Sequence, residues 1–243
     1  MCARSRALVA TMVNVLLGLA LAALADVACA QPAEPVRARN VAPDVWLVQG
    51  EMAMGSAANR NFISNAAFVI TGDGVVVIDA LGSPALAEAL IAEIRRITPQ
   101  PIRHVIVTHY HADHIYGLQA FKAVGATVIA HAAGRDYLNS DTSRLRLEAS
   151  RRDLFPCIDD KTEVLGADRR LHARETRLRV GAVDFDIRHA GPAHTAEALV
   201  VHLPQQGVLF AGDLVLQGRM TRPMPRPTGR ASNTCHCFAP SIA

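Results

Sequence analysis

The chain has 243 residues, a formal net charge of +3 at pH 7 and a hydrophobic fraction of 50%. Nucleic-acid-binding proteins carry a pronounced basic stripe, and neither such a stripe nor an internal repeat occurs here, so we expect no nucleic-acid partner. About two hundred residues beyond the amino-terminal leader are enough for one domain with a single substantial core.

The amino terminus predicts export. Two arginines precede an apolar run over residues 7–25, and Ala28-Cys29-Ala30 supplies the small residues of a secretory cleavage site. We expect residues 1–30 to be a signal peptide, so that the mature protein is periplasmic or secreted and has no membrane contact after cleavage. The alternative is a transmembrane anchor, because the apolar run is about long enough to span a bilayer.

The first half of the domain reads as a polar leader over residues 31–40, then strands and a helix. Strand-like runs lie at residues 45–48, 66–71 and 75–79. The turn Gly72-Asp73-Gly74 joins the last two as a hairpin. A helix is expected from Ser83 as N-cap and Pro84 at its first position. Its apolar stripe consists of Leu86, Leu90, Ile94 and Ile97.

The run His109-Tyr110-His111-Ala112-Asp113-His114 places three imidazoles and a carboxylate within six residues. Residues 103–107 upstream read as a buried strand, and a helix over 115–123 and a strand over 127–130 are expected to follow. The cluster therefore falls on a loop of a parallel β-α-β unit. Histidine nitrogens with a hard carboxylate suit Zn²⁺ first, with Fe and Mn also possible.

Two later segments add potential ligands. Gly191-Pro192-Ala193-His194-Thr195 interrupts a strand pattern and presents His194 on a loop. Residues 208–213 form an apolar strand that ends in Gly212-Asp213, which places a carboxylate where sites in open sheets collect. A helix is expected at residues 145–154, and further strands at 178–180, 183–187, 199–203 and 208–210.

In this order, the H-x-H-x-D-H run, the Gly-x-x-His loop and the Gly-Asp strand resemble the metallo-β-lactamase-fold hydrolase superfamily, over about residues 45–218. Residues 45–50, 59–65 and 109–121 are more narrowly similar to periplasmic metallohydrolases associated with quinoprotein and sulfur-oxidation systems. The resemblance implies an α/β domain over residues 31–218. It also implies that the fold is an αββα sandwich of two mixed β-sheets flanked by helices.

The candidate ligands form two sets, one for each of one or two Zn²⁺ ions. They are His109, His111 and His194 for the first ion, and Asp113, His114 and Asp213 for the second. The expected function is an exported zinc-dependent hydrolase, in which a metal-bound hydroxide would attack an ester, thioester, lactone, lactam or similar bond of a small-molecule substrate. Asp113 is the candidate catalytic residue, because its free oxygen can orient the hydroxide or return a proton to the leaving group.

Two other functions remain open. The same fold with one iron ion acts as an oxygenase on sulfur compounds in some relatives, and a non-catalytic exported metal-binding accessory protein is the third reading. Around the site, the resemblance implies that Asp79 braces the histidine loop, and His189 is a candidate support for the His194 loop. Tyr116 and Asn65 either reach substrate or simply pack and hydrogen-bond, and we favour packing.

From Arg219 onward the chain is rich in proline and arginine and has no apolar periodicity, so we expect residues 219–243 to be an aberrant or disordered tail. The superfamily normally continues with another helix, another strand and a final histidine of the second metal position. We therefore expect these last elements to be missing, through truncation or a reading-frame shift near Gly218. The alternative is that Cys235, His236 or Cys237 supplies the missing ligand.

Overall fold

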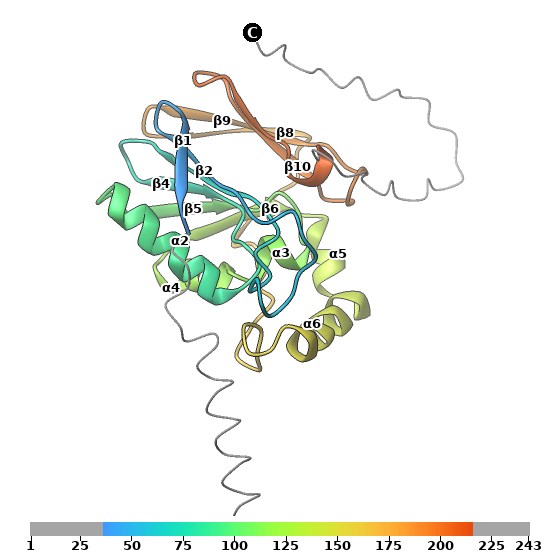
Figure 1. The fold of residues 1–243 in the computed structure, drawn as a ribbon. Coiled ribbons are helices and arrows are strands. Elements are labelled where there is room, and N and C mark those ends of the chain that lie inside the picture. Colours follow the sequence, from blue (N-terminus) through green and yellow to red (C-terminus); the bar gives the residue numbers. More distant parts are fainter. Residues whose placement is uncertain (1–35, 216–243) are drawn as a thin grey trace, which may run out of the picture.

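The structure, a computed structural model, describes residues 36–215. Two β-sheets pack face to face, and the helices lie against the larger sheet, on the side away from the smaller one (Figure 1). The expected signal peptide (residues 1–30) and tail (219–243) lie outside the described residues. No helix within residues 36–215 has the length and apolar character needed to cross a membrane.

The larger sheet is mixed. Its seven strands follow one another in sequence order across the sheet: β1 (Ala38–Ala42), β2 (Val45–Val48), β3 (Ala66–Ile70), β4 (Val75–Ile78), β5 (Ile102–Ile106), β6 (Thr127–His131) and β7 (Arg169–Leu171). Strands β1 to β4 pair antiparallel, as hairpins allow. Strands β4 to β7 pair parallel, which brings the carboxyl ends of these four strands to the same edge.

The smaller sheet is antiparallel throughout its four strands. These are β8 (Glu175–Val180), β9 (Val183–His189), β10 (Leu199–Leu203) and β11 (Val208–Phe210), in the order β11-β10-β9-β8. Side chains alternate along β9, so that Phe185 and Ile187 are buried against the larger sheet while Asp184 and Asp186 lie on the other face. Arg177 and Arg179 pair with these aspartates on the outer face.

The helices are α2 (Pro84–Ile97), α3 (Ala112–Ile115), α4 (Leu118–Ala123), α5 (Gly134–Leu138) and α6 (Asp141–Asp153), with a 3₁₀ turn at Gly212–Leu214. Helix α2 begins as expected, because the Ser83 side chain accepts a hydrogen bond from the amide of Leu86 and Pro84 stands at the first position. Its buried face contains Leu86, Leu90 and Ile94.

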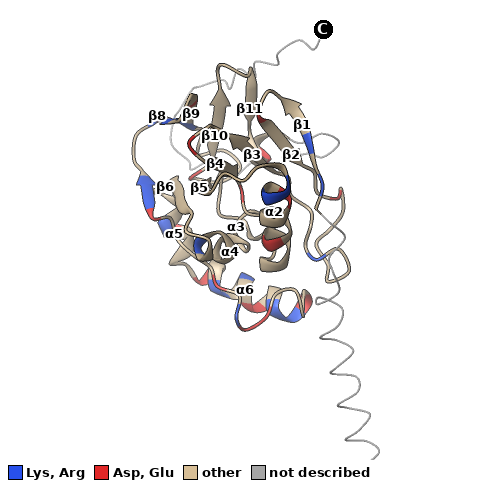
Figure 2. Ribbon diagram, turned by 90° about the vertical axis from the view of Figure 1, so that its left-hand side faces the viewer, with Lys and Arg blue, Asp and Glu red and all other residues tan. Residues whose placement is uncertain are grey.

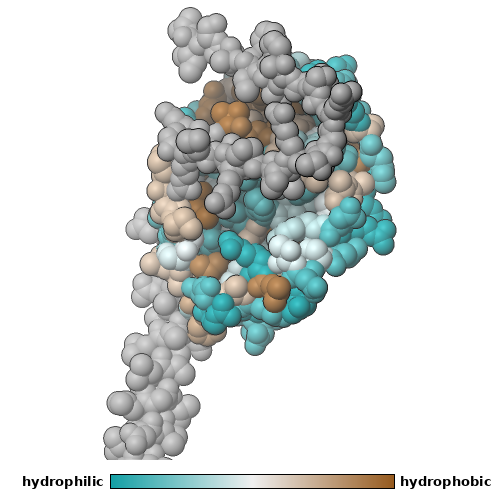
Figure 3. Space-filling model, turned by 90° about the vertical axis from the view of Figure 1, so that its right-hand side faces the viewer, coloured by the Kyte–Doolittle hydropathy of each residue, from teal (hydrophilic) through white to brown (hydrophobic). Residues whose placement is uncertain are grey.

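Burial divides the apolar residues into two cores. One lies between the larger sheet and the helices, and the other lies between the two sheets and consists of strand residues alone. Charged residues gather instead on the outside, notably along α6 (Figure 2). Hydrophilic residues also dominate the described face in Figure 3, where apolar residues stand mostly singly.

The predicted fold class is confirmed, and the structure corrects some element boundaries. A helix was expected at 115–123, but α3 already begins at Ala112 and Gly117 separates it from α4. An added side-chain carbon at Gly117 would lie 2.0 Å from the Ala80 carbonyl oxygen. The chain at Gly117 therefore passes too close to Ala80 for an apolar side chain, and the expected apolar helix face is interrupted there. Strand β1 overlaps the expected polar leader, because pairing with β2 orders a segment that lacks an apolar pattern of its own.

Candidate metal centre

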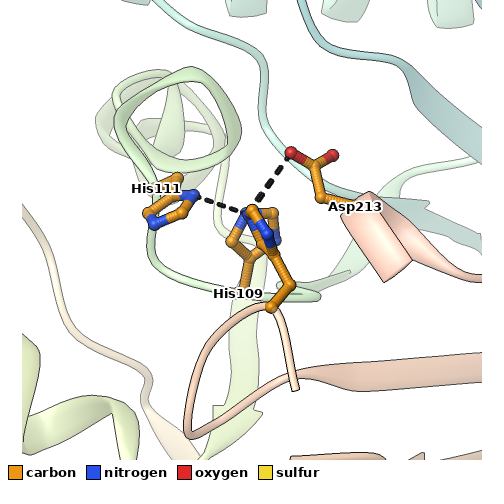
Figure 4. A group of neighbouring side chains, drawn as sticks. His109, His111 and Asp213 are labelled. Carbon is orange, nitrogen blue, oxygen red and sulfur yellow. Dashed lines mark hydrogen bonds and ion pairs between the residues drawn. The ribbon is translucent and has the colours of Figure 1, made fainter. Parts of the chain in front are cut away.

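The segments that carry the predicted ligands meet beyond the carboxyl ends of three strands. His109 and His111 follow β5, His194 lies on the connection from β9 to β10, and Asp213 lies in the turn after β11. One ligand atom from each of these four residues lies within 4.8 Å of the others. Figure 4 shows the imidazoles of His109 and His111 and the carboxylate of Asp213 facing one another.

Individual distances show how tightly this first group is gathered. His194 Nε2 lies 3.0 Å from His111 Nδ1 and 3.5 Å from Asp213 Oδ2. Asp213 Oδ2 is also 3.9 Å from His109 Nε2. Ligands that share one zinc ion, each bonded at about 2.0–2.2 Å, must approach one another in this way. The structure thus brings together the first predicted ligand set and adds Asp213 to it.

The second predicted set converges on His114. Its Nε2 atom lies 3.3 Å from Asp213 Oδ1 and 3.5 Å from Asp113 Oδ2. Asp213 therefore turns one oxygen toward each set. Burial disfavours the charged form of Asp213, but the neighbouring rings of His114, His194 and His111 together outweigh burial and lower the pKa of the carboxyl.

Asp113 and His114 were expected on a loop, and the structure places both in α3. Backbone hydrogen bonds from His114 to His111 and from Tyr116 to Ala112 close this turn. A carboxylate in the first turn of a helix is favoured by the helix dipole, so Asp113 suits this position. The Ser64 hydroxyl donates to the Asp113 carbonyl oxygen and ties the turn to the loop before β3.

Within residues 36–215, two buried ring nitrogens that face the centre have no well-aligned hydrogen-bond partner, although Asp213 oxygens lie 3.3 and 3.9 Å away. These are His109 Nε2 and His114 Nε2, and both rings are almost completely buried. Buried polar atoms are normally paired, because leaving one unpaired costs the free energy of its lost hydration. Histidine nitrogens beside carboxylate oxygens are the donor set that zinc uses in proteins. The residues present therefore fit a zinc site.

Hydrogen bonds at the opposite ring nitrogens orient the two buried histidines. His114 Nδ1 lies 2.9 Å from Asp79 Oδ2, and His109 Nδ1 lies 3.1 Å from the Thr108 hydroxyl. The Thr108 hydroxyl in turn donates to Asp79 at 2.8 Å. These bonds leave the Nε2 atoms facing the centre, as outer hydrogen bonds do in metal sites. Asp79 thus has the bracing position that the resemblance implied.

The pKa shifts differ among the candidate ligands. Burial lowers the pKa of His109 well below its ordinary value, and neighbouring histidines add to this effect. Burial also lowers the pKa of His111. Neutral imidazoles bind a metal without first losing a proton. For His114, burial disfavours the charged ring, but the carboxylates of Asp79 and Asp113 outweigh burial and raise its pKa well above the ordinary value.

The remaining sequence candidates have structural partners. Tyr116 is buried with its hydroxyl 3.4 Å from the Ser150 hydroxyl, and the Asn65 side chain accepts a hydrogen bond from the amide of Gly50. His189 contacts the backbone of the loop that carries His194. Its ring stacks on His131 at 3.7 Å, and its Nε2 lies 2.8 Å from the Ala196 carbonyl oxygen on the His194 loop.

Sequence reasoning missed Thr108 and Glu197. Thr108 is visible in the sequence only as the residue before the histidine run. Glu197 follows His194 by three residues and belongs to no motif, yet its carboxylate accepts a hydrogen bond from the amide of Tyr110 between two ligands. No local signal could reveal this contact, because the two residues are 87 positions apart.

Two packed sheets, helices against one of them and a histidine and aspartate cluster beyond the strand ends define a metal-binding α/β sandwich protein. The profile of the metallo-beta-lactamase superfamily matches residues 59–234, and the chain belongs to this superfamily. The comparisons do not single out the quinoprotein and sulfur-oxidation branch suggested by the sequence.

Among curated proteins, the chain is 26% identical over 162 residues to metallo-beta-lactamase type 2 of Elizabethkingia meningoseptica, covering 65% of this chain and 54% of that protein. It is also 26% identical over 172 residues to metallo-beta-lactamase type 2 of Bacillus cereus, covering 71% and 57%. The chain thus spans little more than half the length of these relatives.

Solved structures support the same fold. The metallo-beta-lactamase from Pontibacter korlensis superimposes with a TM-score of 0.56 at 22% identity, covering 72% of this chain and 70% of that one. Metallo-beta-lactamase IND-7 superimposes with a TM-score of 0.57 at 20% identity, covering 76% and 74%. At this identity the likeness concerns the fold and not the substrate.

Proposed function

We propose that this chain is a zinc-dependent hydrolase of small molecules. The observation that carries the proposal is the convergence of His109, His111, His194 and Asp213 within 4.8 Å, around a buried ring nitrogen that has no well-aligned hydrogen-bond partner in the described chain. His114 and Asp113 extend this group toward a second metal position. Membership of the superfamily supports hydrolysis as the reaction.

The site residues have two proposed roles, which are to hold the metal and to transfer protons. Zinc lowers the pKa of bound water to about 7 and polarises a carbonyl oxygen, so it supplies the nucleophile at neutral pH. His109, His111 and His194 would hold this ion. Asp113 is 21% exposed at its side chain, whereas the His109 and His114 rings are nearly closed to solvent. The Asp113 carboxylate is therefore accessible enough to take a proton or return it to a leaving group.

The substrate class is an ester, thioester, lactone, lactam or similar bond. The names of the curated relatives favour a lactam, and the other bond types stay part of the proposal. A panel containing a chromogenic cephalosporin, p-nitrophenyl acetate, an acyl-homoserine lactone and a glutathione thioester separates these bonds. Turnover of one member identifies the bond type.

Metal dependence is tested with the full chain and a matched histidine pair. Zinc content and turnover are measured for the parent, for His111→Ala and for His202→Ala, because His202 lies on the smaller sheet away from the centre. We expect His111→Ala to lose zinc and turnover while His202→Ala keeps both. Equal zinc and turnover in all three proteins would refute the assignment. Bound iron would support the oxygenase alternative, and bound zinc without turnover would support an accessory protein.

Export is the second part of the proposal. The apolar run before Ala30 supports cleavage after that residue and a periplasmic or secreted mature protein. The test is mass spectrometry of the amino terminus after expression in a host with a secretory pathway. A mature protein that begins at Gln31 is expected. Retention of residues 1–30 would contradict export by cleavage.

A further inference from the structure

Glu197 is a buried carboxylate outside the group of metal-facing atoms. Glu197 is 5% exposed, and its Oε1 atom accepts a hydrogen bond of 3.1 Å from the amide of Tyr110. Tyr110 stands between His109 and His111 in the sequence, and Glu197 stands three residues after His194. This bond therefore joins the two ligand-bearing segments, which come from different sheets.

A second hydrogen bond runs beside the first. The amide of Leu199, where β10 begins, donates to the carbonyl oxygen of Thr108 at 2.8 Å. The pair of bonds connects residues 108–110 with residues 197–199 on both sides of His109. Two hydrogen bonds limit the movement of residues 108–110 relative to residues 197–199, and so hold the His109 backbone in place beside the His194 loop.

The Tyr110 ring makes this connection rigid. It is buried, and its hydroxyl accepts a hydrogen bond of 3.1 Å from the amide of Ala167. The ring also fills the space beside Gly134, where an added side-chain carbon would lie 2.2 Å from it. The ring thus fixes Tyr110 on one side, and Glu197 fixes its backbone on the other.

From these contacts we propose that Glu197 is a positioning residue, whose carboxylate sets the geometry of the His109, His111 and His194 ligand set. The inference rests on the proposed metal site. Burying a carboxylate is costly, and among residues 36–215 no lysine or arginine forms an ion pair with Glu197. The acceptor bond to Tyr110 is thus its main identified polar contact, and that contact lies between two ligands.

Glu93 offers a matched control. It is also 5% exposed and accepts a hydrogen bond of 3.1 Å from a backbone amide, that of Ala38. Glu93 lies on α2 and pairs with Arg96, away from the ligand segments. Replacing either glutamate removes a buried acceptor and lowers stability, but only Glu197 should affect metal binding.

The experiment measures zinc affinity by competition with a chelating dye, and ligand geometry by the visible absorption of the cobalt(II) form. We expect Glu197→Leu to weaken zinc binding by about 10–100-fold, as loss of an outer hydrogen bond typically does, and to alter the cobalt spectrum. Glu197→Gln keeps an oxygen acceptor and should restore affinity to within a few-fold of the parent. Glu93→Leu should leave affinity and spectrum unchanged.

Parental affinity and spectrum in a folded Glu197→Leu protein would overturn the inference, and so would a Glu197→Gln protein as impaired as Glu197→Leu. If Glu197→Leu does not fold, Glu197→Asp replaces it, because its shorter side chain cannot reach Tyr110. Glu197→Asp should then bind zinc more weakly than Glu197→Gln, and equal affinities would refute the role. A parent chain that takes up no zinc would instead refute the proposed function.

Discussion

Asp79 and His114 form a buried pair at the back of the candidate metal centre, with Asp79 Oδ2 only 2.9 Å from His114 Nδ1. The same carboxylate accepts hydrogen bonds from the amide and the hydroxyl of Thr108, at 2.7 and 2.8 Å. Thr108 in turn contacts His109. One side chain at the end of β4 thus orients a histidine from each of the two predicted ligand sets.

Replacing Asp79 with asparagine should weaken zinc binding by about 10–100-fold, since outer hydrogen bonds of this kind have effects of that size. Asparagine tolerates the left-handed backbone at this position (φ 61°), so the change removes the charge and one acceptor without straining the turn. Zinc competition with a chelator measures the effect. Asp184→Asn, on the outer face of the smaller sheet, should bind zinc like the parent.

Gly212→Ala should lower both stability and zinc affinity. Gly212 has φ 52°, and an added side-chain carbon would lie 2.8 Å from the Thr108 hydroxyl, which would displace the neighbouring Asp213. Gly207→Ala is a matched control, because Gly207 has φ 64° but open space around it. Both variants should lose about 1 kcal/mol from backbone strain, whereas only Gly212→Ala should lose zinc. Similar zinc affinities in the two variants would contradict this account.

Gly117→Ala tests the close packing at the junction between α3 and α4. Gly117 is the N-cap of α4 and has φ −83° and ψ −6°, angles that alanine also adopts, so any strain comes from packing and not from the backbone angles. The new carbon would lie 2.0 Å from the Ala80 carbonyl oxygen and 2.6 Å from Ala87, and such overpacking costs about 1–3 kcal/mol or more. We expect net destabilisation in urea unfolding. A more stable variant would show that the segments separate easily.

The stacked pair of His131 and His189 predicts a pH dependence of stability. Burial lowers the pKa of His131. The neighbouring His189 and His172 lower this pKa further, and Glu197 raises it slightly. The unfolded chain therefore binds this proton more readily than the folded chain, and the free energy of unfolding falls as pH drops through the ordinary histidine range near 6.5.

Urea unfolding of the metal-free protein between pH 7.5 and about 5.5 tests this dependence. His131→Asn keeps an acceptor for the amide of Ala133 but cannot take up the proton, so its stability should fall less steeply with decreasing pH. His202→Asn on the smaller sheet serves as the control and should follow the parent. Parallel curves for the His131→Asn and parent proteins would show that His131 does not contribute.

The amino-acid sequence by itself determined the features whose signals are local. Strand β2 follows from a short apolar run, and the start of α2 at Ser83 and Pro84 follows from capping chemistry within a few residues. The H-x-H-x-D-H run, with His194 and Asp213 on later loops, likewise predicted a metal site, because it places four ligand side chains within six residues. The fold class was predicted from the order of the expected strands and helices together with the resemblance to the superfamily.

Only the tertiary structure decided which side chains support the site and which histidine each carboxylate oxygen faces. Glu197 reaches Tyr110 from 87 positions away, and β7 exists because β6 pairs with it and not because its three residues carry a pattern. Asp213 turns one oxygen to His194 and the other to His114. Such contacts depend on how two sheets pack against each other, and the periodicity of a single segment contains no information on that packing.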